Sequence, residues 1–214
     1  MKRSDAWRKW INVLLTVMVV IGYLMVILVG DGGMSVSGRD SLKYFTVQSN
    51  LLEGAASVMW LMINGRKKVS EKARRFGEVV KYVAGVCVGL TFVTVMVFLG
   101  PLYGYLSMLR GANIFFHLAV PLLAMAEVVG GSERMGWREN LLAMIPMLLY
   151  GTVYLVNILV NGLGEPFQRD IYGFVTWGMP IGIGIFAAIC AADFLIGLVL
   201  RGCSGIWRSR HAAG

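Results

Sequence analysis

The chain has 214 residues, 57% of them hydrophobic, and a formal net charge of +8 at pH 7. A soluble domain of this size would not carry so large an apolar fraction, so the composition excludes a water-soluble enzyme and indicates an integral membrane protein. Apolar stretches account for most of the chain. We therefore expect a single domain over residues 1–214, without a separate soluble domain.

Six of these stretches are long enough to cross a bilayer, for which roughly 17–25 residues are needed. In chain order they are 10–29, 44–64, 79–100, 112–129, 141–160 and 176–200. Because the loops between them are short, consecutive spans should be antiparallel neighbours. The predicted fold class is all-α, a polytopic membrane bundle of six transmembrane helices.

Basic residues predict the orientation of this bundle. The first span follows a basic stretch, as in a signal peptide, but its apolar run is too long and no small-residue cleavage site follows, so we interpret it as a retained anchor. Most of the 20 Lys and Arg residues fall on the side of the N-terminus, and the exceptions are Arg39, Lys43, Arg110 and Arg169. The positive-inside rule then places both termini in the cytoplasm of a cell-membrane protein. Orientation also explains the basic loop 66–81, so we expect no nucleic-acid partner.

The second span carries a polar stripe. On a helical wheel its members fall within an arc of roughly 100°, whereas Gln48 points elsewhere. They are Thr46, Ser49, Asn50, Glu53 and Ser57. Such a stripe must face protein or water, because acyl chains cannot satisfy polar groups.

Two further spans carry polar residues at helical spacing. The fourth has Asn113 and His117 one turn apart, and the fifth has Tyr150, Tyr154, Asn157 and Asn161. The second and fourth spans both begin outside, so Thr46 should lie on the order of 6 Å and His117 on the order of 8 Å below the outer interface. Asn157 reaches a similar level. A hydroxyl and an imidazole at one depth are the minimum parts of a nucleophile and its base.

Each of these residues also has a structural interpretation. Thr46 could bond a carbonyl of its own helix, and His117 could tie two helices together. Glu53 could be a protonated, hydrogen-bonded packing residue or part of a proton or ion path. Several other chemistries lack their motifs: a bis-histidine haem site, Cys/His metal spacing, a Gly-x-Ser-x-Gly elbow and a P-loop. The three cysteines show no paired spacing. We expect no metal and no cofactor.

Two short motifs resemble a known family. The segment Lys43-Tyr44-Phe45-Thr46 at the start of the second span, and Asn-x-x-x-His over 113–117, resemble the androgen-induced membrane hydrolase family. The chain is closer to its prokaryotic six-span relatives, which carry Phe-Thr-x-Gln-Ser-Asn, here residues 45–50. This resemblance implies a threonine hydrolase of fatty acid esters of hydroxy fatty acids, with Thr46 as nucleophile and His117 as base. The eukaryotic members continue differently after the threonine, and the proline after the histidine has another offset, which affects the expected substrate more than the fold.

The first functional hypothesis is an intramembrane hydrolase of a membrane lipid or fatty acyl ester. His117 would take the proton of Thr46, whose oxygen attacks the carbonyl carbon. Ser49, Asn50 or Asn113 would donate to the oxyanion, and Glu53 or Asn157 would orient the imidazole. The expected pocket residues are Gln48, Tyr150, Tyr154 and Asn157.

The alternative hypothesis is a non-enzymatic small-molecule or ion carrier, or a membrane assembly protein, with a polar cavity between spans 2, 4 and 5. Depth discriminates between the two, because a conduction path needs polar groups through the full thickness of the bilayer. The sequence places a dense cluster in the outer half, then Glu53, and then only scattered Ser57, Thr91, Thr94 and Asp193. That pattern favours a cavity open on one side.

Overall fold

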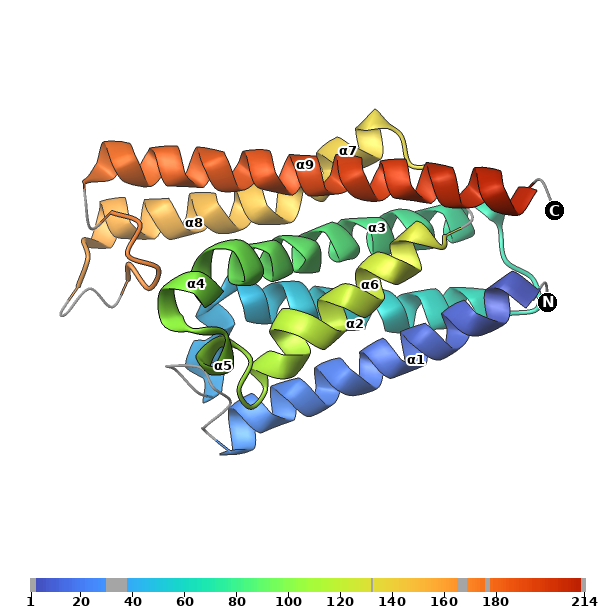
Figure 1. Ribbon diagram of the computed structural model, residues 1–214, viewed down its shortest axis with the longest axis horizontal. Coiled ribbons are helices and arrows are strands. Elements are labelled where there is room, and N and C mark those ends of the chain that lie inside the picture. Colours follow the sequence, from blue (N-terminus) through green and yellow to red (C-terminus); the bar gives the residue numbers. More distant parts are fainter. Residues whose placement is uncertain (1–2, 30–37, 132, 165–168, 176–177, 213–214) are drawn as a thin grey trace.

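The computed structural model describes residues 3–29, 38–131, 133–164, 169–175 and 178–212, and every regular element among them is a helix. The long helices lie side by side in one bundle (Figure 1). The start of α1 (Arg3–Leu24) and the end of α9 (Met179–Ala212) share one end of the bundle, called here the terminal end. The other end is called the opposite end.

Between α1 and α9 the chain alternates long helices with short turns of helix. Three short elements, η1, η3 and η4, are π-helical, and η2 is a 3₁₀ helix. In chain order the elements are η1 (Met25–Val29), η2 (Gly38–Lys43), α2 (Phe45–Asn64), α3 (Glu71–Val93), η3 (Thr94–Leu99), α4 (Gly100–Tyr103), α5 (Tyr105–Met108), η4 (Phe115–Ala119), α6 (Val120–Val129), α7 (Trp137–Ala143) and α8 (Ile145–Asn161).

Four helical segments are long and apolar enough to cross a membrane: Ala6–Leu28, Glu71–Tyr103, Trp137–Asn161 and Met179–Arg210. The other two predicted spans are helical as well. The polar stripe of α2 lowers its mean hydropathy, and the apolar helix Phe115–Val129 is shorter than the other four. The described part of the chain is therefore all-helical, with four helices of membrane-spanning length and composition.

The predicted span boundaries differ from the helices mainly at the terminal end. The third predicted span began at residue 79, but α3 begins at Glu71, where the Ser70 hydroxyl accepts from the Ala73 N–H at 3.2 Å and caps the helix. The last predicted span ended at residue 200, whereas α9 continues to Ala212. Hydropathy does not register polar helical turns beyond the apolar run. The predicted start at Thr176 lies outside the described residues.

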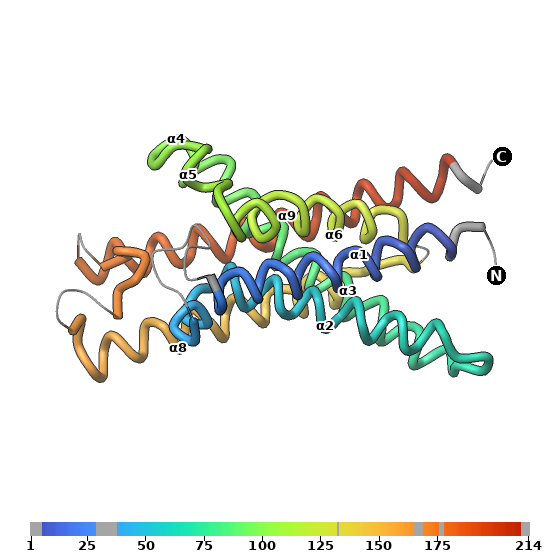
Figure 2. Tube along the Cα trace, turned by 90° about the horizontal axis from the view of Figure 1, so that it is seen from below, coloured from blue at the N-terminus to red at the C-terminus, as the bar shows by residue number. Residues whose placement is uncertain are grey.

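The three π segments gather at the opposite end of the bundle, near α4 and α5, which stand apart from the other helices in Figure 2. π turns are rare, and they occur frequently at functional sites. Pro101 and Pro121 each lie two residues after the last residue of a π segment, and in both cases the helix continues beyond the proline. A wider turn gives room to a ring that would otherwise clash with the preceding carbonyl.

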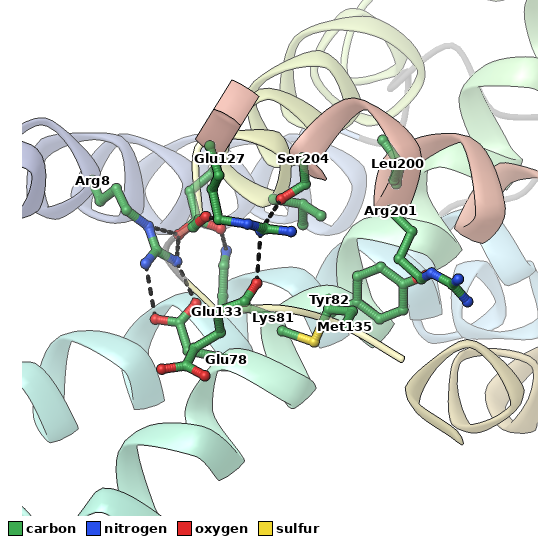
Figure 3. A pocket seen from close by; sticks show the side chains of 13 residues that line it. Arg8, Glu78, Lys81, Tyr82, Glu127, Glu133, Met135, Leu200, Arg201 and Ser204 are labelled. Atoms are coloured by element: carbon green, nitrogen blue, oxygen red, sulfur yellow. Dashed lines mark hydrogen bonds and ion pairs between the residues drawn. The ribbon is translucent and has the colours of Figure 1, made fainter. Parts of the chain in front are cut away.

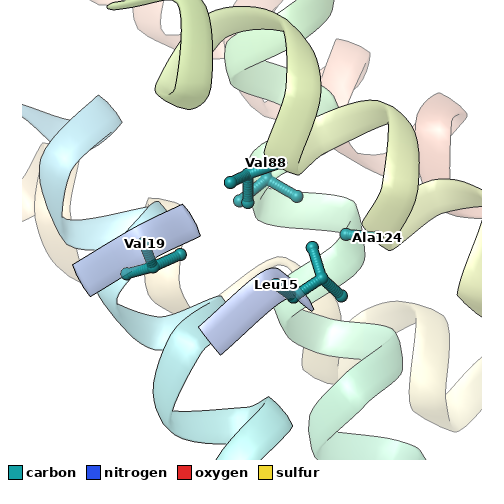
Figure 4. Close-up of a cluster of buried hydrophobic side chains, with 5 residues drawn as sticks. Leu15, Val19, Val88 and Ala124 are labelled. Carbon is teal, nitrogen blue, oxygen red and sulfur yellow. The ribbon is translucent and has the colours of Figure 1, made fainter. Parts of the chain in front are cut away.

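Apolar packing holds α1, α3 and α6 together beside α2. Leu15 and Val19 of α1 meet Val88 of α3 and Ala124 of α6, and all four side chains are buried (Figure 4). Gly54 of α2 admits Val19, since a Cβ at this glycine would lie 2.9 Å from the valine. The helices α1, α2, α3 and α6 therefore pack apolar side chains next to the polar stripe.

The polar stripe of α2 faces this core. Ser49, Asn50, Glu53 and Ser57 are at most 2% exposed, and Thr46 is half-buried. Gln48, which was predicted to point elsewhere, is exposed. The prediction that the stripe faces protein is confirmed by this burial.

Candidate functional site

His117 lies in the π segment η4 and is 6% exposed. Its Nδ1 atom lies 2.6 Å from the carbonyl oxygen of Met108. A carbonyl oxygen only accepts, so Nδ1 must carry a hydrogen, and in the neutral ring Nε2 then keeps its lone pair. The imidazole is thereby fixed as the tautomer that can act as a base through Nε2.

The turn that holds His117 is tied to the start of α2 by Asn50. The Asn50 side-chain amide donates to the Thr46 carbonyl at 2.8 Å and to the Phe116 carbonyl at 3.1 Å. The two motifs predicted to meet therefore adjoin. Within the described part of the chain, however, the Thr46 hydroxyl makes no hydrogen bond, with His117 or with any other residue.

The predicted oxyanion donors differ in their surroundings. Both amide hydrogens of Asn50 are engaged. The Ser49 hydroxyl lies 3.1 Å from the Thr46 carbonyl oxygen and 3.1 Å from the Thr91 hydroxyl. Asn113 is buried one turn before His117, immediately ahead of η4. Asn113 is thus the predicted donor that shares a helix with the base.

Neither residue predicted to orient the imidazole hydrogen bonds to it. Glu53 binds Lys81 and accepts from Ser57, and the Asn157 amide oxygen accepts from Asn161 at 2.9 Å. The Met108 backbone carbonyl takes the orienting position instead. A backbone atom brought beside the ring by tertiary folding has no signature in a side-chain pattern.

A groove with a volume of about 810 Å³ lies along the first turns of α2, between α2, α8 and the segment 169–171. All four predicted pocket residues line it, together with Ser49. Its walls are otherwise largely apolar: Leu42, Phe45, Leu52, Leu149, Val153 and Ile171. Cys87 of α3 contributes, and no residue of η4 or α6 does. The groove therefore lies between predicted spans 2, 3 and 5 instead of 2, 4 and 5, and neither Thr46 nor His117 lines it.

An aromatic cluster adjoins the groove through Tyr150 and Tyr154, which line it. The Tyr172 hydroxyl accepts from the Phe45 N–H at 2.9 Å, and the Tyr150 hydroxyl donates to the Lys43 carbonyl at 2.7 Å. The Tyr154 hydroxyl donates to Asp170, whose carboxylate also accepts two backbone N–H groups. Burial raises the pKa of the Tyr172 phenol. These bonds attach the segment 170–175 to the first turn of α2.

Sequence reasoning missed a buried ion network near the terminal end (Figure 3). Arg8 and Lys81 were counted as cytoplasmic charges, but they are 3% and 1% exposed. Arg8 binds both oxygens of Glu78 at 2.8 Å and Oε1 of Glu127, while Lys81 pairs with Glu53. Charges of opposite sign within or next to apolar spans were the available signal.

The network extends the polar stripe along the bundle. Ser49, Glu53 and Ser57 repeat every fourth residue on α2, and the Lys81 ammonium donates to the Ser57 hydroxyl at 3.0 Å. Lys81 also lies 3.7 Å from Glu127. Polar groups thus continue from the groove to the terminal end, in contrast to the predicted one-sided pattern.

The Asp193 side chain does not hydrogen bond to Arg201, the cation two turns further along α9. Its carboxylate on α9 is 1% exposed, and neither oxygen accepts a hydrogen bond from a described residue. Arg201 instead places its guanidinium carbon 4.8 Å from the centre of the Trp137 ring. In the described ranges, no three His, Cys, Asp or Glu side chains are arranged to hold a metal ion.

Comparisons with known proteins place the chain in no group: no family model, no curated protein and no solved structure matches it.

Proposed function

We propose that the chain crosses the bilayer six times, with both termini in the cytoplasm. Two observations support this topology. The helices α2 and η4–α6 run alongside the four long apolar helices, and the start of α1 shares an end with the end of α9 (Figure 1). An even number of crossings would bring the start of α1 and the end of α9 to the same side of the membrane. The excess of basic residues at the terminal end supports a cytoplasmic location for that side.

At the outer end of this bundle we propose an intramembrane hydrolase of lipid esters, with Thr46 as nucleophile and His117 as general base. The observation that carries this proposal is the bond from His117 Nδ1 to the Met108 carbonyl, which leaves Nε2 free to take a proton. The Asn50 bridge supports it, because it holds the Thr46 turn against the His117 turn. Hydrogen bonds between catalytic groups often form only when substrate is bound.

The reaction follows from these positions. Nε2 of His117 takes the proton of the Thr46 hydroxyl as its oxygen attacks the ester carbonyl carbon. The tetrahedral intermediate collapses, and the leaving alcohol receives that proton from His117. His117 then deprotonates a water molecule that attacks the acyl-threonine, and the proton returns to the Thr46 oxygen as the carboxylic acid leaves. Asn113 is the proposed donor to the oxyanion, which a dry site stabilises strongly.

The neighbouring groove supports a lipid substrate. Its apolar walls suit an acyl chain, and it lies between α2 and α8 near the proposed outer surface. Ser49 belongs both to the groove wall and to the Thr46 turn, because its hydroxyl lies 3.1 Å from the Thr46 carbonyl oxygen. An acyl chain in the groove would therefore bring its ester group toward Thr46.

The test is covalent labelling of purified protein by a fluorophosphonate probe, with the labelled residue located by mass spectrometry. Thr46→Val keeps the shape of the side chain but removes the nucleophile, so labelling should disappear. His117→Asn keeps an amide that can donate to the Met108 carbonyl but lacks a base, and labelling should slow by about 10²–10⁴-fold. Thr152→Val on α8 is the matched control, because Thr152 is exposed.

Two results would contradict the assignment. One is labelling that persists in both Thr46→Val and His117→Asn at the wild-type rate. The other is a labelled peptide that carries Ser49 instead of Thr46, which would make the groove serine the nucleophile.

A second candidate function is a proton carrier. The observation that favours it is the run of buried ionic groups from Glu53 through Lys81 and Glu127 to Arg8, which begins one helical turn from Ser49. Proteoliposomes with a pH-sensitive dye inside should then acidify faster than protein-free vesicles under an imposed potential. Lys81→Met should abolish the difference and Lys72→Met, at an exposed position, should not. Equal rates for wild-type and empty vesicles would contradict transport.

A further inference from the structure

The buried ion network has more negative than positive side chains. Arg8 and Lys81 are its cations, and Glu53, Glu78 and Glu127 are its carboxylates. All five side chains are at most 6% exposed. An uncompensated charge is costly away from water, so a network with three carboxylates and two cations needs one more positive charge.

Two of the three carboxylates each accept three hydrogen bonds. Glu127 Oε1 accepts from Arg8 Nε at 2.8 Å, from a terminal nitrogen of Arg8 at 2.5 Å and from the Asn12 amide at 3.3 Å. Glu78 accepts two bonds from Arg8 at 2.8 Å and one from the Trp60 indole at 2.9 Å. Donors of this number favour the ionised form of a carboxyl group.

Glu53 has fewer donors than the other two carboxylates. Its Oε1 accepts from Lys81 and from the Ser57 hydroxyl, but Lys81 also faces Glu127. Its Oε2 is buried and has no hydrogen-bond partner in the described part of the chain, and the same holds for Glu127 Oε2 and for the side-chain oxygens of Asn12 and Asn50. The surroundings therefore contain surplus acceptors and one shared cation. A proton on Glu53 would supply both the missing charge and a missing donor.

The neighbouring elements do not supply another cation. Arg208 of α9 donates to the Glu133 carbonyl at 2.8 Å and to the Ser204 hydroxyl at 2.5 Å. Arg201 stacks on Trp137, and Asp193 adds a further buried carboxyl group. Among the described residues, neither arginine forms an ion pair with Glu53, Glu78 or Glu127.

We propose that Glu53 is a proton-binding site, occupied at neutral pH, in which the bound proton balances the surplus negative charge of the ion network. The site lies one helical turn from Ser49 in the groove wall. It uses neither Thr46 nor His117, so it stands or fails independently of the proposed hydrolase.

The first test is infrared spectroscopy of the purified protein at neutral pH, where a neutral carboxyl group gives a C=O band separate from carboxylate bands. The comparison is made in an Asp193→Asn background, because Asp193 is also buried without donors. Asp193→Asn should retain one such band that shifts in D₂O, and adding Glu53→Gln should remove it. A missing band in Asp193→Asn, or a band that survives Glu53→Gln, would overturn the proposal.

The second test compares matched neutral substitutions by thermal unfolding. Glu53→Gln replaces an already neutral group, so its unfolding temperature should stay within a few degrees of wild type. Glu127→Gln removes the carboxylate that binds Arg8 and should lower that temperature much further. Equal losses, or the reverse order, would contradict the proposal. If Glu53→Gln does not fold, Glu53→Asp in the Asp193→Asn background should move the neutral-carboxyl band, and an unmoved band counts against Glu53.

Discussion

The two polar regions of α2 are built in different ways. Near its start, Ser49 and Asn50 are uncharged and bond mainly to backbone carbonyls of α2 and η4. Further along, Glu53 joins an ion network that draws on α1, α3 and α6. Neutral bonds can be exchanged for bonds to a substrate at small cost, whereas buried ion pairs cannot be broken singly without leaving a charge exposed to apolar protein.

The neutral region is better suited to chemistry, and the charged region is better suited to stabilising the fold. The neutral region lies among π turns and loops at the opposite end, beside the groove, where backbone geometry is irregular. The charged region lies between regular helices in the tightly packed inner bundle. Substitutions should therefore cost more stability in the ion network than around Asn50, and three variants test that order.

The largest loss of stability is expected for Lys81→Met. The variant keeps the length of the side chain but leaves Glu53 and Glu127 without their shared cation, and breaking a buried ion pair from one side costs about 3–5 kcal/mol. The unfolding temperature in detergent, followed by loss of the monodisperse peak after heating, measures it. Lys72→Met, at the exposed second residue of α3, should be close to wild type. Equal stability of the two variants would mean that the network contributes little.

An intermediate loss of stability is expected for Asn50→Leu. The variant removes two hydrogen bonds and leaves the Phe116 carbonyl without the Asn50 amide, at a cost of about 1–3 kcal/mol. Asn64→Leu is the matched control, because the Asn64 amide makes the same kind of bond, to the Trp60 carbonyl of its own helix, but reaches no other helix. If both substitutions lower the unfolding temperature equally, the bridge between α2 and η4 adds nothing to stability.

The sequence predicted the helices and the polar stripe because both depend on periodicity. Apolar runs located all the long helices to within a few turns, and the spacing of Asn50 and Glu53 showed which side of α2 turns inward. Chain order and loop length also brought the His117 turn to the start of α2. These features follow from local rules that a single sequence carries.

The sequence could not predict which groups complete each site. The partner of His117 is a backbone carbonyl in α5, a type of atom that every residue possesses. The partners of Glu53 and Glu127 were visible as Lys81 and Arg8, but the same residues also fit the positive-inside rule. Their burial depends on how the helices rotate against one another, which tertiary packing decides.

The smallest loss of stability is expected for Tyr172→Phe, in the aromatic cluster that adjoins the groove. It removes one bond, from the Phe45 N–H, worth about 1 kcal/mol. Burial raises the Tyr172 pKa, so the folded protein keeps this proton when the unfolded chain loses it near the ordinary value of 10.0. Wild-type stability should consequently fall as pH rises above about 10, and the fall should be smaller in Tyr172→Phe. Tyr103→Phe, at a 66% exposed position, should match wild type in both respects, and identical pH profiles for all three proteins would show that Tyr172 is not held in a buried contact.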